Sequence, residues 1–247
     1  MVAITSHVPI PFRIIALVQE QNNLLGYPLE RLATMISELG FRCTGCGQCC
    51  TRDYSGHVFL LDRDADATRR IDPAALVPAP CPEFCDQNGI IYIPGYALRT
   101  KGDAAGSCWF LEDRRCQIYD QRFSACRTFP FTLHREPFEN GKLEWRCISP
   151  PLRHGAICQE VTADECLTLA REIKEHEHAV ISHEIEFLEF IRAYFSDQNL
   201  RHDQHIFDLA MQRFSRGGAV TVRVYSNQDL AEYRCRGSWL PVHGVHT

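Results

Sequence analysis

The sequence lacks a long hydrophobic run. No stretch approaches the roughly 20 consecutive apolar residues that a helix needs to cross a bilayer. The N-terminal segment MVAITSHVPIPFRIIALVQEQ also lacks the basic start and the uninterrupted apolar run of a secretory signal. We therefore expect a soluble protein of the cytoplasm, without a membrane partner.

An excess of positive charge is absent as well. Lys and Arg number 26 against 31 Asp and Glu, a formal net charge of -5, and the basic residues do not gather into one dense run. Phosphate backbones are bound by concentrated positive charge, so no nucleic-acid partner is expected. With 247 residues, 45% of them hydrophobic, the chain is long enough to bury a core without disulfides.

Cysteine, in contrast, is abundant. The chain has 13 cysteines, an odd count, so a complete set of intramolecular disulfides would leave one thiol over. Clustered cysteines in a cytosolic chain indicate metal binding or redox chemistry rather than bridges, because that compartment keeps thiols reduced.

Four cysteines fall within one short stretch, FRCTGCGQCC, namely Cys43, Cys46, Cys49 and Cys50. A Cys-x2-Cys pair turns two thiolates toward one point, and a third at the same interval is typical of loops that wrap iron–sulfur clusters. The intervening Gly45 and Gly47 favour close approach of the backbone to a large inorganic centre. Side chains of adjacent residues diverge, so one member of the Cys49–Cys50 pair is expected to serve a second centre or to be buried.

A second group of cysteines lies in residues 107–131 and comprises Cys108, Cys116 and Cys126. Their spacing fits no single zinc-finger pattern, but aromatic residues flank each of them and would restrict the access of solvent to a site. Arg122 and Arg127 would offset the negative charge of clustered thiolates and donate hydrogen bonds to sulfur. The alternative interpretation is an aromatic core strip with surface arginines.

Together these motifs resemble the cysteine-cluster family called YkgJ, described as zinc- or iron-chelating. The resemblance covers roughly residues 41–150 and depends on the order, spacing and flanking aromatics of the two cysteine groups. It implies one later ligand, for which Cys147 is the best match and Cys158 the second choice. The eight matching cysteines are the number needed for two four-ligand centres, which would hold iron–sulfur clusters, with 4Fe–4S favoured, or zinc.

The resemblance leaves three functions open. The first is an iron–sulfur protein in electron transfer or in the modification of a protein substrate, and the second is a structural zinc module that presents its helical half to a protein partner. The third is a lysine N-methylase-like enzyme, because a similar cluster occurs in the flagellin lysine N-methylases. We favour iron–sulfur over zinc, since a tetrahedral zinc site rarely takes three ligands from seven consecutive residues. No glycine-rich loop for a methyl donor and no nucleophile–base pair is recognisable, so catalytic residues stay unassigned.

The remaining cysteines carry weaker signals. Cys81 and Cys85, in CPEFC, indicate either an extra ligand pair or a local turn. Cys166 lies beside leucines in a helical pattern and is expected to pack in a core, whereas Cys235 cannot be assigned.

The predicted fold class is α+β. We expect a small, irregular, cysteine-rich metal-binding core with short strands, flanked by an N-terminal helix and a helical C-terminal half. The predicted segments are a helical segment at 1–40, a cysteine-cluster domain at 41–158, a helical region at 159–215, and a strand and tail at 216–247.

Local signals support these segments. Apolar residues at helical spacing end at Gly40, and Thr162 and Glu165 have the spacing of a capping box before a long charged helix. Alternating runs, including HVFLL, GIIYIPGYALRT and KLEWRC, predict short strands, with a turn at Asn140-Gly141. GGAVTVRVYS predicts one further strand, and the tail after Tyr233 has no clear signal.

Overall fold

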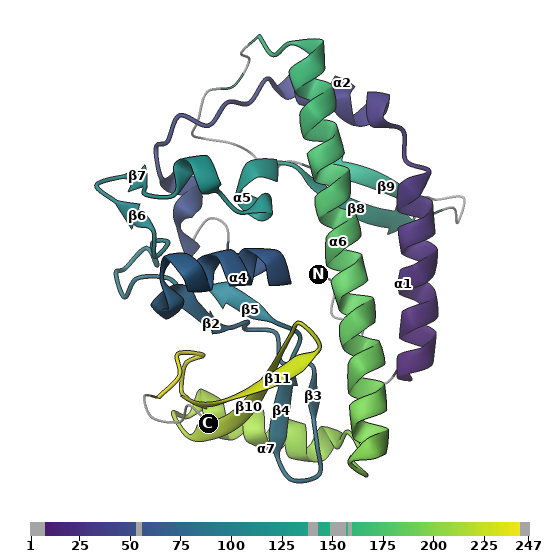
Figure 1. Cartoon of the computed structure of the whole chain (residues 1–247), viewed down its shortest axis with the longest axis vertical. Helices are drawn as coiled ribbons and strands as arrows, with labels where there is room; N and C mark the ends of the chain where they lie inside the picture. Colours follow the sequence, from purple (N-terminus) through teal and green to yellow (C-terminus); the bar gives the residue numbers. More distant parts are fainter. Residues whose placement is uncertain (1–7, 53–55, 138–142, 149–156, 158–159, 243–247) are drawn as a thin grey trace. The chain divides into compact units, whose positions relative to one another are not determined.

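The computed structural model has a mixed α+β fold and describes residues 8–52, 56–137, 143–148, 157 and 160–242 (Figure 1). The predicted α+β class is therefore confirmed. Two compact units divide the chain, and neither is continuous in sequence. The sheet unit comprises Met1–Leu17, His57–Thr100 and His183–Thr247, and the cysteine unit comprises Val18–Gly56 and Lys101–Ser182.

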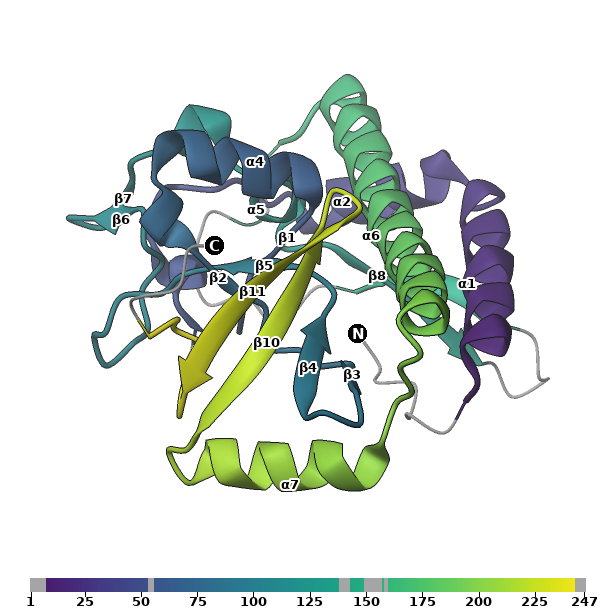
Figure 2. The same cartoon turned by 60° about the horizontal axis from the view of Figure 1, so that its bottom comes forward.

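The sheet unit contains a four-stranded sheet in the order β11-β10-β4-β3. Strand β10 pairs antiparallel with β11 and parallel with β4, as Figure 2 shows, and β4 pairs antiparallel with β3. Val220, Val222 and Val224 alternate along β10 and are buried, which is the period of two expected for one covered face. The strands span Phe84–Cys85 (β3), Ile90–Ile93 (β4), Ala219–Ser226 (β10) and Asp229–Arg236 (β11).

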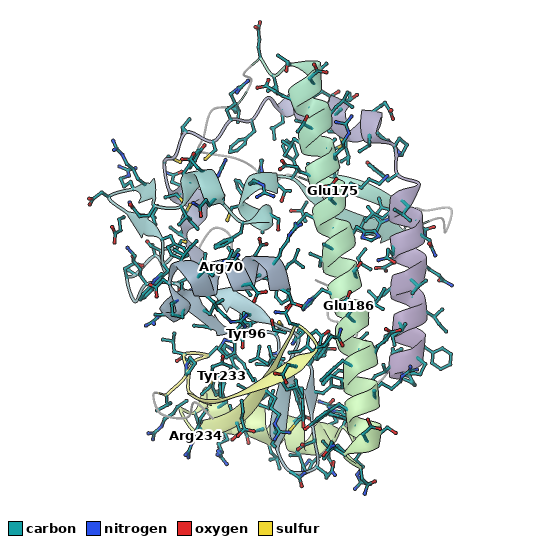
Figure 3. The ribbon with its side chains drawn as sticks, viewed as in Figure 1. Arg70, Tyr96, Glu175, Glu186, Tyr233 and Arg234 are labelled. Atoms are coloured by element: carbon teal, nitrogen blue, oxygen red, sulfur yellow. The ribbon has the colours of Figure 1, made fainter. Side chains whose placement is uncertain are left out.

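A second, three-stranded sheet in the same unit has the order β1-β5-β2. The two sheets are linked through Tyr96 on β5 and Tyr233 on β11, whose hydroxyls are 2.9 Å apart (Figure 3). The strands are Phe59–Leu60 (β1), Leu76–Pro78 (β2) and Tyr96–Leu98 (β5). The helices of this unit are α4 (Asp62–Ile71), the 3-10 turn η2 (Pro73–Ala75) and α7 (Gln204–Ser215).

The cysteine unit has more irregular structure with short elements. Helix α2 (Leu29–Leu39) ends at Gly40, whose φ of 55° lies in the left-handed region that glycine favours. The elements that follow are η1 (Gln48–Cys50), β6 (Leu111–Glu112), β7 (Arg115–Cys116), η3 (Tyr119–Gln121), α5 (Ser124–Thr128), β8 (Thr132–Pro137) and β9 (Leu143–Ile148). The predicted strands and helices therefore occur, while the turn predicted at Asn140-Gly141 lies outside the described residues.

Two long helices, α1 (Ile10–Leu25) and α6 (Ala163–Asp197), contribute to both units. The capping box that begins α6 is confirmed, because Thr162 N donates to Glu165 Oε2 at 2.8 Å and Glu165 N donates to Thr162 Oγ1 at 3.3 Å. Within the cysteine unit, Lys174 Nζ donates to the carbonyls of Leu25 and Tyr27, each at 2.8 Å. Among the described helices, α6 included, none combines the length and the apolar character needed to span a membrane.

Two features differ from the simplest interpretation of the sequence. Residues 57–100, placed in the predicted cysteine-cluster segment, have their contacts in the sheet unit. The tail after Tyr233 continues a strand, β11, that the sequence did not reveal, because its turn uses Asn227 and Gln228 with φ of 51° and 62° instead of a glycine. The predicted domain boundaries stay predictions.

Candidate metal site

The loop of the first cysteine motif has the conformation that its glycines allow. Gly45 and Gly47 have φ of 69° and 76°, which other residues adopt at a cost. A Cβ on Gly47 would also approach Leu111 Cδ1 at 3.1 Å. Cys43 is exposed, and Cys46, Cys49 and Cys50 are half-buried, so the loop presents its thiols between the interior and the solvent.

Backbone hydrogen bonds join this loop to the second motif. Cys108 N donates to the carbonyl of Cys50 at 2.7 Å, and Thr51 forms an antiparallel bridge with Ser107. Arg52 N continues the pairing by donating to the Gly106 carbonyl at 3.0 Å. Cysteines from two distant segments of the chain are therefore fixed side by side at their backbones.

A small hairpin carries Cys116 toward the same place. Leu111 on β6 pairs with Cys116 on β7, and the turn between them uses Asp113 and Arg114 at φ of 45° and 61°. The hairpin is anchored to the second motif, since Leu111 N donates to the Cys108 carbonyl at 3.0 Å.

Cys126 comes from α5, the short helix that follows Phe123. Phe110 and Phe123 are buried, with ring centroids 6.3 Å apart, and Phe131 is buried as well. Tyr119 is instead 38% exposed. Aromatic residues were expected to shield the site from solvent; these three are buried, whereas Tyr119 lies at the surface.

The pKa values of five thiols in this group are shifted by neighbouring thiols. The pKa of Cys126 is raised to about 12, first by burial and then by the charges of Cys108, Cys50 and Cys116. That of Cys49 is raised by a hydrogen bond with Cys50, then by burial and by the charges of Cys50, Cys43 and Cys46. Thiols gathered in this way repel one another as thiolates, and a bound cation would remove that repulsion.

One thiol of the group is already favoured as a thiolate. The pKa of Cys50 is lowered to about 7, first by the hydrogen bond with Cys49 and then by the charge of Arg122, while burial acts in the opposite direction. Burial and neighbouring thiols raise the pKa values of Cys116 and Cys126, and the charge of Arg122 partly offsets this increase.

The two predicted arginines differ in their contacts. Arg122 stacks over the Tyr119 ring at 4.0 Å from its centroid and donates from Nε to the Tyr119 carbonyl at 3.0 Å. Arg127 donates from Nη1 to the Arg122 carbonyl at 2.8 Å and pairs with Glu172 of α6 at 3.4 Å. Arg122 therefore acts on the thiols directly, and Arg127 supports Arg122.

The eighth predicted ligand has different surroundings. Cys147 lies on β9 opposite Leu133, is 5% exposed, and has a pKa raised to about 11 by burial alone. Cys158, the second choice, lies outside the described residues. Cys147 as a ligand thus stays a prediction from the family resemblance.

The other cysteines lie apart from this group or in a core. Cys81, Cys85 and Cys235 belong to the sheet unit, and Cys85 and Cys235 are fully buried there. Cys166 on α6 is 2% exposed, as expected for core packing. None of the cysteines in the described part of the chain forms a disulfide.

Two neighbours of the site were not singled out from the sequence as interacting with thiols. Tyr119 forms a side-chain hydrogen bond with Cys43, and its pKa is raised by burial and by the charge of Cys43. The Lys101 charge lowers the pKa of Cys108 against the larger effect of burial, and Lys101 Nζ donates to the Leu111 carbonyl. Lys101 belongs to no local motif, so no sequence signal pointed to it.

No three Cys, His, Asp or Glu side chains of the described residues stand in a ready coordinating arrangement. The donor chemistry nevertheless fits zinc or iron, since soft thiolate ligands select these metals and a guanidinium offsets part of their charge. Fold and site together define a cysteine-rich metal-binding domain.

The family comparison agrees with this class. Residues 42–148 match the CxxCxxCC family, described as a "putative zinc- or iron-chelating domain". This match over residues 42–148 confirms the resemblance found in the motifs. No solved structure matches the chain.

Proposed function

We propose that the clustered thiolates of the cysteine unit bind metal and that this metal is iron, held as iron–sulfur clusters. One observation carries the proposal: backbone hydrogen bonds hold the first cysteine motif beside the second, with Cys108 N donating to the Cys50 carbonyl at 2.7 Å and Thr51 bridged to Ser107. The proposed ligands are Cys43, Cys46, Cys49, Cys50, Cys108, Cys116 and Cys126, together with Cys147, which the family resemblance implies.

The first motif favours iron–sulfur over zinc. Three cysteines at Cys-x2 intervals are typical of loops that wrap a cluster, and the positive φ of Gly45 and Gly47 allows the close backbone approach that a cluster requires. A bound cluster would supply one-electron transfer, in exchange with a redox partner or in the modification of another protein. A cytoplasmic location, the compartment in which thiols stay reduced, is part of this proposal.

The chain's own residues have distinct roles in this proposal. The thiolates bind, Arg122 offsets their negative charge, and the buried rings of Phe110 and Phe123 limit the access of water. Cys43 is exposed, so the first motif is the side of the site nearest to solvent and to an exchanging partner.

The test is an anaerobic purification of the full chain, with iron, zinc and acid-labile sulfide counted per chain and the visible spectrum recorded. Matching iron and sulfide with a broad visible band that bleaches under dithionite would support the proposal. Stoichiometric zinc in a colourless protein would reject the cluster and retain metal binding. Absence of both metals would reject the proposed function.

A structural zinc site is the second candidate, and the short strands beside the thiols favour it. Strands β6 and β7 have two residues each, which gives little hydrogen-bonded structure around the thiols. Structural zinc contributes about 10–16 kcal/mol of apparent binding free energy to folding in zinc-finger peptides, enough to order such a unit.

A further inference from the structure

Lys101 begins the segment that leads to the second cysteine motif, and its main chain is fixed close to Cys108. Lys101 N donates to the Ser107 carbonyl at 2.6 Å, which closes a short loop. Asp103 secures the same loop, because Ser107 N donates to its Oδ1 at 2.8 Å and Gly106 N donates to its carbonyl at 3.1 Å. The main chain of Lys101 is therefore held next to the residue that precedes Cys108.

The side chain of Lys101 reaches from this loop to the β6–β7 hairpin. It is half-buried, and its Nζ donates to the Leu111 carbonyl on β6. Leu111 lies opposite Cys116 in the hairpin, and its N–H points away from the partner strand, because it donates to the Cys108 carbonyl at 3.0 Å. In an antiparallel pair of this kind the carbonyl points outward as well. Lys101 therefore satisfies an outward carbonyl that the hairpin itself leaves without a partner strand.

Leu111 is also the residue through which the hairpin contacts the first cysteine motif. A Cβ on Gly47 would lie 3.1 Å from Leu111 Cδ1 and 3.5 Å from the Arg114 carbonyl. The hairpin thus lies directly against the backbone between Cys46 and Cys49. Strands of two residues supply few hydrogen bonds of their own, and an isolated hairpin is marginally stable at best. The position of this hairpin consequently depends on contacts such as the one from Lys101.

A lysine suits this task for two physical reasons. A hydrogen bond from an ammonium group to a carbonyl is charge-assisted, and such bonds are roughly twice as strong as neutral ones. The ammonium also brings a positive charge to a segment that carries two of the proposed thiolate ligands, Cys108 and Cys116, and offsets part of their negative charge.

We infer that Lys101 is a positioning residue of the metal site: its hydrogen bond to Leu111 holds the β6–β7 hairpin, and with it Cys116, in the metal-binding arrangement. This inference rests on the proposed function and adds to it a residue that belongs to neither cysteine motif. Lys101 does not bind the metal itself and acts through Leu111 and Cys116. Its removal should therefore lower the affinity for metal and change the coordination of the metal that still binds.

The test variant is Lys101→Met, because methionine keeps a long, flexible side chain but neither donates a hydrogen bond nor carries a charge. Co²⁺ is the probe, added anaerobically to the reduced, metal-free full chain, and its affinity is measured by competition with a chelator. We expect Lys101→Met to weaken Co²⁺ binding by roughly 10–100-fold, the range found when groups that support metal ligands are removed. Lys101→Arg keeps both the donor and the charge and should restore most of the affinity.

The d–d absorption of bound Co²⁺ separates positioning from a general loss of stability, since these bands report the number and arrangement of thiolates around the ion. At saturating Co²⁺, Lys101→Met should change these bands. Lys174→Met is the matched control, because Lys174 Nζ also donates to backbone carbonyls of the cysteine unit, those of Leu25 and Tyr27, neither of which is in a cysteine motif. The control should lower the stability of the chain and leave the affinity and the bands unchanged.

Three outcomes would overturn the inference. The first is an unchanged affinity and spectrum in Lys101→Met, and the second is an equal effect of Lys101→Met and Lys174→Met, since a general loss of stability would explain both. The third is a Lys101→Arg variant as impaired as Lys101→Met. A wild-type chain that binds no Co²⁺ would instead reject the proposed function, and this inference with it.

A further measurement uses the wild-type chain and so does not depend on the folding of a variant. If Lys101 favours the metal-binding arrangement, bound metal must favour the Lys101–Leu111 hydrogen bond by the same factor. Lysines are acetylated with an amine-reactive reagent, with and without Co²⁺, and the rate at each is followed by mass spectrometry. Lys101 should react more slowly in the loaded chain, whereas Lys174 should react equally in both. Equal rates at Lys101 with and without Co²⁺ would overturn the inference.

Discussion

At the scale of single residues, Arg122 is a positive charge that acts on three thiols of the cysteine group. Its guanidinium lies over Tyr119 and lowers the pKa of three thiols that come from three different segments. A fixed positive charge of this kind favours thiolates over thiols, which metal binding requires.

We expect Arg122→Gln to weaken metal binding by roughly 10–100-fold, the range found when groups that support metal ligands are removed. Competition with a chelator of known affinity measures the change. Arg127→Gln is the matched control, because Arg127 pairs with Glu172 and should affect metal affinity far less. Equal losses in both variants would show that Arg122 has no special role.

Cys147→Ser is expected to lower the amount of bound metal, since it removes the eighth ligand predicted from the family motif, and to lower the free energy of unfolding of the metal-free chain by about 1–2 kcal/mol, since it places a hydroxyl in a buried site. Metal content and denaturant unfolding measure the two effects. Unchanged metal content in the folded variant would instead reject Cys147 as the eighth ligand.

At the scale of secondary-structure elements, short turns with positive φ place functional residues. The β6–β7 turn holds Cys116 opposite Leu111 although its central residues, Asp113 and Arg114, are not glycines. The β10–β11 turn is built in the same way at Asn227 and Gln228. Such turns suit the twist of a hairpin but give a weak sequence signal without glycine.

Arg114→Gly should stabilise the chain by about 0.5–1 kcal/mol, because Asp-Gly is a preferred pair for this turn and glycine accepts a φ of 61° freely. Thermal unfolding measures the change. Arg115→Gly, one residue later on the exposed strand β7, should be neutral or destabilising, and stabilisation by both changes would contradict the explanation.

Glu177 on α6 gives a prediction about pH. Burial, followed by the charge of Glu20, raises its pKa to about 7, so the folded chain holds a proton that the unfolded chain releases near its ordinary pKa of 4.5. The contribution of this group to stability is therefore present below pH 4.5 and is lost as the pH rises through about 7.

Glu177→Gln should consequently be more stable than the wild-type chain at alkaline pH, by roughly 1–2 kcal/mol, and the difference should vanish in acid. Unfolding curves across pH measure this. Glu175→Gln is the control, since Glu175 is exposed on the same helix (Figure 3). An unchanged difference at all pH values would reject the assignment to Glu177.

At the scale of the whole molecule, the two units have different sources of stability. The sheet unit has paired eight-residue strands and fully buried apolar side chains such as Val222 and Val224. In the cysteine unit, the thiols lie beside the two-residue strands β6 and β7 and repel one another when ionised. A bound cation is therefore expected to matter mainly to the cysteine unit.

Removal of the metal by a chelator should raise amide hydrogen exchange in residues 101–137 while β4 and β10 keep their protection. Hydrogen exchange with mass spectrometry, with and without the chelator, measures this. Equal loss of protection in both units would mean that metal binding stabilises the chain as a whole.

Much of the fold and part of the site could be predicted from local signals. The end of α2 at Gly40 and the capping box of Thr162 follow from short-range hydrogen bonds, and the valines of β10 from strict alternation. Strand β11 was missed because its turn has no glycine and its face is largely polar. The sequence could not show that residues 57–100 belong to the sheet unit and not to the cysteine unit, since this depends on pairing between β4 and the distant strand β10.

The metal-binding chemistry of this protein can be read from its residues alone. Cysteine spacing, with glycines between, is a local property of the chain, and it sufficed to predict a zinc- or iron-chelating domain. Which cysteines lie close together depends on the three-dimensional fold. Cys50 and Cys108 are far apart in the sequence, and they are neighbours because Cys108 N donates to the Cys50 carbonyl and Thr51 forms a bridge with Ser107. Spacing fixes the neighbours within one loop, whereas long-range hydrogen bonds fix the neighbours between loops.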